Sequence, residues 1–208
     1  KMVNELVNVR DKHRGLKKTL KIFLIVFVVL FLLIIVFAAG YLLKKPTYVE
    51  VFIENPLINI VEANTNIEGE VDVPAVIEQA VIEFDEDYIN YLLAALGTGY
   101  LHKSLVGGDP FLELVMNDGS ENEIWHAEVI EGMPNSALGE IDNEDLRITI
   151  SKEEAVKAIL SEDIGQFMKD SYSQGNLGIE MVANKAELFA KGYLEMYKML
   201  TGEEVPVE

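Results

Sequence analysis

The longest feature of the hydrophobic pattern is an uninterrupted apolar stretch near the N-terminus. Residues 22–43 carry no charge, and 22 residues in a helix span roughly 33 Å, against a bilayer hydrocarbon core of about 30 Å. No polar stripe runs along this stretch, as it would in a helix at the edge of a soluble core. Ala38-Ala39-Gly40 resembles a signal-peptide cleavage site, but the apolar run continues beyond it, which favours an uncleaved anchor. The pattern predicts a transmembrane helix over 22–43.

The next segment, 44–84, changes to short apolar runs. Within 67–73, Ile67, Gly69, Val71 and Val73 alternate with acidic residues, which is typical of a half-buried strand. We therefore expect 44–84 to be a membrane-proximal, β-rich spacer, with the first strands of the following domain as the alternative.

From residue 85 the chain alternates between helical and strand periodicity. Asp85 is a candidate N-cap of a helix that ends at Gly97. Strands are predicted at 111–116 and 124–130, on either side of Asn117-Asp118-Gly119, which favours a turn. A further strand is predicted at 146–150, where apolar and polar residues alternate.

The C-terminal part is predicted to be mainly helical. Ser151-Lys152-Glu153-Glu154 matches a capping box at the start of a helix, and a second helix follows it. Alternation over 177–181 predicts another strand, and the last helix is expected from Asn184 to Gly202. The order predicts an α+β domain over 85–202, with an antiparallel sheet and helices packed on one face, before a short tail at 203–208.

Charge divides the chain at the apolar stretch. Residues 1–45 carry nine Lys and Arg against two acids, a net of +7, whereas residues 46–208 carry eight against 33, a net of −25. Six basic residues lie at 10–21 and only Lys44 and Lys45 follow the span, so 1–21 is expected to be a basic cytoplasmic tail and 46–208 extracytoplasmic. Single-pass insertion in the cell membrane follows. The acidic part lacks the clustered basic residues of a nucleic-acid surface, so no nucleic-acid partner is expected.

Candidate chemistry is sparse. The chain has no cysteine, which excludes disulfides, thiolate nucleophiles and cysteine-bound zinc. His102 lies two residues from Ser104, but no Gly-x-Ser-x-Gly motif surrounds that serine, and His126 fits a solvent-facing strand position. No acidic run fits the twelve-residue calcium loop, and no phosphate-binding or Rossmann glycine pattern occurs. The sequence-based expectation is a chain that is not an enzyme, with no catalytic residue, metal or cofactor.

The C-terminal third is rich in methionine and aromatic residues. A packed core is one interpretation, and an adaptable apolar cavity is the other, because flexible Met side chains suit such a cavity. The residues that would line the cavity are Phe167, Met168, Leu177, Ile179, Met181, Phe189, Tyr193 and Met196.

Residues from roughly 85 to 200 resemble the sterol-carrier-protein-2-like (SCP2-like) domain. The most similar stretch is Leu146-Arg147-Ile148-Thr149-Ile150-Ser151-Lys152-Glu153-Glu154, a strand that runs into a capped helix. It continues to Gln174-Gly175-Asn176-Leu177-Gly178-Ile179-Glu180 and a last helix. The family usually has a Lys-rich glycine run before its last strand, where this chain has only Gly175 and Gly178. The resemblance implies an apolar tunnel closed by the terminal helix and non-covalent binding of a lipid.

Two functions are therefore expected from the sequence. The first is a membrane-anchored extracytoplasmic domain that binds a lipid or other apolar small molecule non-covalently. The alternative is a non-catalytic scaffold or accessory subunit of a cell-envelope complex, which recruits an envelope protein partner through its acidic surface.

Overall fold

The computed structural model describes residues 26–36, 48–104, 107–119 and 122–203. The chain divides into two units, residues 1–45 and residues 46–208. In the first unit, the described residues form a helix over 26–36. Among the described residues, none of the helices has the length and apolar character needed to cross a membrane. The remainder of the predicted span, 22–25 and 37–43, lies outside the described residues, as do the basic tail 1–21 and most of 203–208.

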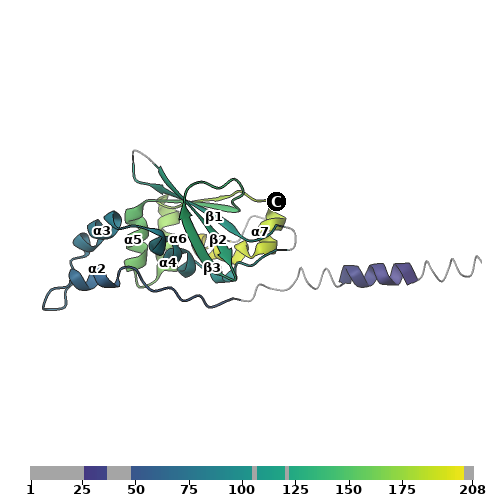
Figure 1. Ribbon diagram of the computed structural model, residues 1–208, viewed down its shortest axis with the longest axis horizontal. Coiled ribbons are helices and arrows are strands. Elements are labelled where there is room, and N and C mark those ends of the chain that lie inside the picture. The colour runs from purple at the N-terminus through teal and green to yellow at the C-terminus, as the bar shows by residue number, and fades with distance from the viewer. Residues whose placement is uncertain (1–25, 37–47, 105–106, 120–121, 204–208) are drawn as a thin grey trace, which may run out of the picture. The chain divides into compact units, whose positions relative to one another are not determined.

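The second unit is an α+β domain built on one five-stranded sheet (Figure 1). Its strands are β1 (Phe111–Asn117), β2 (Asn122–Ile130), β3 (Met133–Leu138), β4 (Leu146–Ile150) and β5 (Gly178–Met181). Its helices are α2 (Ile58–Ala63), α3 (Val73–Ile82), α4 (Glu86–Ala95), the short 3-10 helix η1 (Thr98–Tyr100), α5 (Lys152–Leu160), α6 (Ile164–Gln174), α7 (Lys185–Lys191) and α8 (Tyr193–Thr201).

The sheet is mixed, which corrects the prediction of an antiparallel sheet. Its strand order is β3-β2-β1-β4-β5, and β1 pairs in parallel with β4 while the other three pairs are antiparallel. The connection 139–145 carries the chain from β3, at one edge, past β2 and β1 to the far side of β1. Since β2 is antiparallel to both β3 and β1, those two strands run in the same direction, and β4 is parallel to both.

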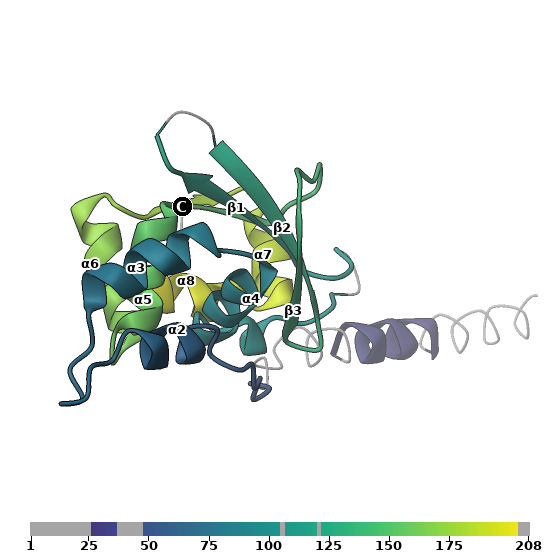
Figure 2. The same ribbon diagram turned by 60° about the vertical axis from the view of Figure 1, so that its left-hand side comes forward.

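One face of the sheet is covered and the other is open. On the covered face, Leu112 and Leu114 of β1 and Leu146 and Ile148 of β4 are at most 1% exposed and belong to the hydrophobic core. In the helical layer α3 packs on α5, α5 on α6, and α6 on α8 (Figure 2). The open face carries mainly polar side chains, so the alternation predicted in these strands corresponds to a one-sided sheet.

The segment predicted to be β-rich contains two helices instead. Among the described residues of 44–84, α2 and α3 form, and the only β contact is an isolated bridge between Thr65 and Val71. The Asp72 carboxylate accepts a hydrogen bond from the backbone N–H of Ala75, and Pro74 lies in the first turn, so α3 has both a cap and a residue suited to a helix start. The strand prediction over 67–73 was wrong. The alternation of apolar and acidic residues there is short, and the cap at Asp72 together with Pro74 begins a helix instead.

The caps predicted for two helices are present. Asp85 accepts from the N–H of Asp87 at the start of α4, and the Ser151 hydroxyl accepts from the N–H of Glu154 at the start of α5. The Glu154 carboxylate, however, accepts a hydrogen bond from the Ser171 hydroxyl at 2.7 Å rather than completing a capping box. It thereby ties α5 to α6.

The predicted final helix is two helices. Gly192, with φ of +91°, ends α7 and precedes α8. A Cβ atom at this position would lie 2.2 Å from the carbonyl oxygen of Tyr100, so the break requires glycine on grounds of both φ and space.

Candidate functional site

An open groove lies where α3, the end of β1 and the start of α5 meet. It has a volume of about 990 Å³, within the approximate 300–1,000 Å³ of small-molecule sites. Its lining comprises Pro74, Ile77, Glu78, Val81, Ile82, Asn117, Asp118, Ser151, Lys152 and Glu153. The described part of the chain therefore contains a groove with an apolar helix face on one side and polar residues on the other.

Helical periodicity explains why α3 supplies the apolar side. Val76 and Ala80, one turn apart, are fully buried in the core. The next row around the helix, Ile77 and Val81, is partly buried at the core margin. Ile82 ends the helix and is 79% exposed, so its side chain is open to solvent beside the groove.

The opposite side of the groove is organised around Lys152. Its backbone N–H donates to Asp118 Oδ1 at 3.0 Å, and its Nζ pairs with Glu123 Oε2 at 2.9 Å. Nζ also lies 5.7 Å from the centre of the Phe84 ring, in a cation–π arrangement. Although burial opposes it, the hydrogen bonds from Lys152 and Trp125 lower the pKa of Glu123. The pair is thus held charged at neutral pH.

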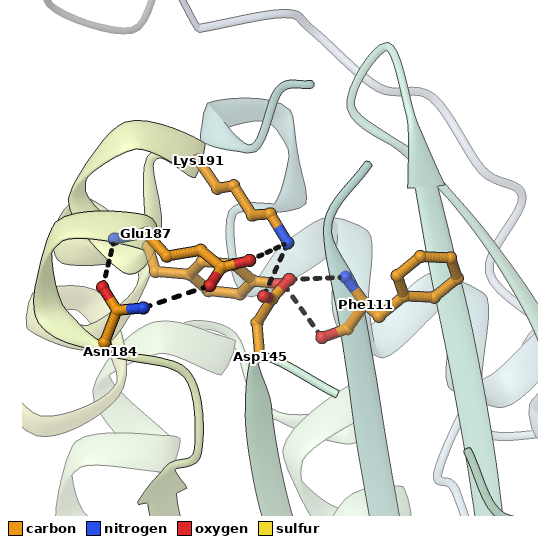
Figure 3. Close-up of polar contacts among 6 residues, drawn as sticks. Phe111, Asp145, Asn184, Glu187 and Lys191 are labelled. Carbon is orange, nitrogen blue, oxygen red and sulfur yellow. Dashed lines mark hydrogen bonds and ion pairs between the residues drawn. The ribbon is translucent and has the colours of Figure 1, made fainter. Parts of the chain in front are cut away.

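A second polar cluster is buried between the sheet and α7 (Figure 3). Lys191 Nζ lies 2.6 Å from Asp145 Oδ1, and both side chains are 2% exposed. Lys191 also pairs with Glu187 at 3.1 Å, and Asp145 Oδ2 accepts the N–H of Phe111 at 2.8 Å. The Tyr193 hydroxyl lies 3.0 Å from Asp145 Oδ2, and burial followed by the charge of Asp145 raises the pKa of Tyr193 well above its ordinary value.

Each charge in this cluster has a partner inside the protein. Both carboxylate oxygens of Asp145 accept hydrogen bonds, and the Lys191 ammonium faces two carboxylates. The arrangement connects the start of β4 to α7 and α8, which is a structural task. Among the described residues, the cluster contains no buried side-chain nitrogen or oxygen without a hydrogen-bond partner.

The open face of the sheet carries a third cluster. Arg147 of β4 pairs with Glu113 of β1, with Glu144 of the connection 139–145 and with Glu180 of β5. His126 of β2 contacts the carbonyl oxygen of Gly139 through Nδ1 at 3.0 Å. These contacts hold the connection at both ends. Among the described residues, no group of three or more His, Asp or Glu side chains is arranged to hold a metal ion.

The residues expected to line a C-terminal cavity lie in or near the core. Four of them belong to the core and are at most 2% exposed: Met168, Leu177, Tyr193 and Met196. Three pack against the core: Phe167, Ile179 and Met181. Phe189, on α7, is half exposed. None of the eight lines the groove. The structure thus brings seven of them together and leaves Phe189 apart.

Sequence reasoning missed the groove because it lies on α3. The signal available was the spacing of Pro74, Ile77 and Val81, at intervals of three and four residues. These three residues lie within 44–84, the segment that was predicted to be a β-rich spacer. His102, considered with Ser104, contacts the carbonyl oxygen of Tyr100 through Nδ1 at 3.2 Å.

Comparison with known proteins gives distant structural matches only. No protein-family model and no curated protein matches the chain. A double mutant of the sec-alkyl sulfatase PisA1 matches with 16% identity and a TM-score of 0.33, over 56% of this chain and 16% of that chain. The MycE methyltransferase of the mycinamycin biosynthetic pathway, in complex with Mg and SAH, matches with 11% identity and a TM-score of 0.37, over 74% of this chain and 40% of that chain.

These matches correct one expectation. The proteins matched are named as a sulfatase and a methyltransferase, which contradicts the expectation that this chain is not an enzyme, and that expectation is withdrawn. At TM-scores of 0.33 to 0.37, the likeness carries no argument for a particular activity.

Proposed function

We propose that the chain is a single-pass membrane protein whose residues 46–208 lie outside the cytoplasm and bind a lipid or other apolar ligand non-covalently. The observation that carries the proposal is the groove beside α3, where Ile77, Val81 and the 79%-exposed Ile82 offer an apolar wall. Burial of a side chain such as isoleucine contributes about 1.5–3 kcal/mol, so a ligand that covers Ile82 gains affinity from it.

Membrane anchoring is supported by the N-terminal unit. Each residue of the helix over 26–36 is apolar, and each side chain is 47–67% exposed. A helix that is apolar on every side is suited to a lipid environment rather than to the surface of a soluble domain. The uncharged stretch 22–43 extends it to membrane length in the sequence, and the basic residues before it favour a cytoplasmic N-terminus.

The proposal also includes an SCP2-like fold for the second unit. In its support, β4 runs directly into the capped helix α5, Gly178 begins β5, and α8 is the terminal helix. These are the elements on which the resemblance rests. Because one fold serves many functions, the proposed ligand binding rests on the groove rather than on the fold.

Photolabelling of the full chain in nanodiscs tests the proposal. An uncharged alkyl photoprobe with a diazirine group is irradiated with the protein, and the labelled peptides are identified by mass spectrometry. We expect saturable labelling of the peptide that contains α3, displaced by an excess of the same alkyl compound without the diazirine. Labelling that does not saturate, or that is confined to residues 164–200, would overturn the assignment of the groove.

A further inference from the structure

We propose that the groove selects amphiphiles with a cationic polar end and rejects those with an anionic one. This inference rests on the proposed function, since it concerns the ligand of the same groove. Its basis is the distribution of charge around the apolar wall.

The groove lining carries an excess of negative charge. It includes the acids Glu78, Asp118 and Glu153 and one base, Lys152, a net of −2. Two ion pairs cancel the other charges nearby: Lys152 pairs with Glu123 and Lys157 pairs with Glu153. Among the described residues, Glu78 and Asp118 take part in no ion pair. The two charges of the groove lining that lack a basic side chain as partner among the described residues are therefore carboxylates.

The groups that would receive an anionic head group are already occupied. The first backbone N–H of α5, from Lys152, donates to Asp118 Oδ1, so a protein carboxylate sits at the positive end of that helix. The Lys152 ammonium lies 2.9 Å from Glu123 and its side chain is only 15% exposed. A ligand carboxylate or phosphate would have to displace both contacts and would face Asp118 at close range.

A cationic head group meets the opposite conditions. Glu78 lies on the same helical row as Pro74 and Ile82, four residues from each, so its carboxylate is adjacent to the apolar wall. An ammonium group near Glu78 or Asp118 would leave its alkyl chain free to cover Ile77, Val81 and Ile82. Favourable charge pairing and apolar burial are then satisfied by one orientation of the ligand.

The experiment compares three amphiphiles of equal chain length against the photoprobe, using the full chain in phosphatidylcholine nanodiscs. These are dodecyltrimethylammonium, dodecanol and dodecyl phosphate, the two ionic compounds below their micelle concentrations and the alcohol below its solubility limit. We expect the ammonium compound to displace the photoprobe from α3 at a concentration at least about tenfold lower than the phosphate, with the alcohol between them. At a salt concentration of about 0.5 M the electrostatic screening length falls to roughly 3–5 Å. Because these charges are at the protein surface, this salt concentration should reduce the ratio between the phosphate and ammonium concentrations.

Charge-neutral variants separate the protein's contribution from partitioning into lipid. The double substitution Glu78→Gln and Asp118→Asn keeps an acceptor for the Lys152 N–H, and should reduce the ammonium-to-phosphate ratio to within about threefold. Glu195→Gln, which removes an exposed acid on α8 outside the groove, is the matched control and should keep the wild-type ratio.

The outcomes distinguish the inference from the proposed function. A phosphate that competes as well as the ammonium compound, or a ratio that the double variant leaves unchanged, would overturn the charge selectivity while ligand binding stands. Absence of saturable labelling in every arm would instead contradict the groove as a ligand site, and with it both proposals.

Discussion

At the scale of single residues, the most constrained contact is the buried pair between Lys191 and Asp145. Two charges taken out of water are stabilising only while each retains its partner, and removal of one partner from a buried pair costs about 3–5 kcal/mol. Lys191→Met leaves Asp145 buried with an uncompensated charge. We expect this variant of residues 46–208 to lose about 3–5 kcal/mol of unfolding free energy in urea, followed by the fluorescence of Trp125, the one tryptophan of the chain.

Lys157→Met is the matched control for this prediction. Lys157 pairs with Glu153 on the surface of α5, with exposed side-chain fractions of 39% and 60%. Such exposed pairs contribute about 0–1 kcal/mol. If the two substitutions had equal effects on the unfolding free energy, the buried cluster would not have the structural role assigned to it.

At the scale of secondary-structure elements, the break between α7 and α8 depends on Gly192. Gly192→Ala would place a Cβ 2.2 Å from the Tyr100 carbonyl oxygen at a φ of +91°. Gly175→Ala, at a φ of +80° with no atom within 4 Å, carries the backbone strain without the clash. Thermal unfolding should show a loss of about 1–2 kcal/mol for Gly175→Ala and a larger loss for Gly192→Ala.

Equal losses for the two alanine variants would mean that the helices can shift away from Tyr100. A single continuous helix through Gly192, as the sequence predicts, would instead make Gly192→Ala stabilising by about 1 kcal/mol, because alanine has the higher helix propensity. The comparison therefore decides between two arrangements of the C-terminal helices.

The sequence predicts these elements well where the signals are local. Asp85 and Ser151 act as N-caps as expected, because a cap depends on residues within one helical turn. The parallel pairing of β1 with β4 was not predictable from alternation, which reports the buried face of a strand and not its neighbour. Helix α3 was not predicted, because the alternation of apolar and acidic residues before Pro74 indicated a strand, although Asp72 caps a helix there.

The candidate site was harder to predict than the fold for a related reason. Methionine and aromatic residues such as Met168 and Met196 fit a cavity and a packed core equally well in sequence. Which residues border a groove depends on where distant elements meet, and here the end of β1 meets α3 and α5. No spacing along the chain contains that information.

At the scale of the whole molecule, the proposed topology places residues 1–21 and residues 46–208 on opposite sides of a membrane. Because the chain contains no cysteine, a single introduced cysteine can report its location. In intact cells that produce the chain, we expect a membrane-impermeant maleimide to label Glu195→Cys, and to label Asp11→Cys only after lysis. Labelling of Asp11→Cys in intact cells would reverse the orientation, and equal protection of both sites would place the acidic unit in the cytoplasm.

The central claim is that the groove beside α3 binds an apolar ligand, and the most direct test is the affinity of the alkyl photoprobe for two matched variants. Ile82 borders the groove, whereas Ile67, fully exposed in a turn, does not, so Ile82→Gln and Ile67→Gln make the same chemical change at similarly exposed positions. The account predicts that Ile82→Gln weakens saturable labelling about tenfold or more and that Ile67→Gln leaves it unchanged. Equal affinities for the two variants would contradict it.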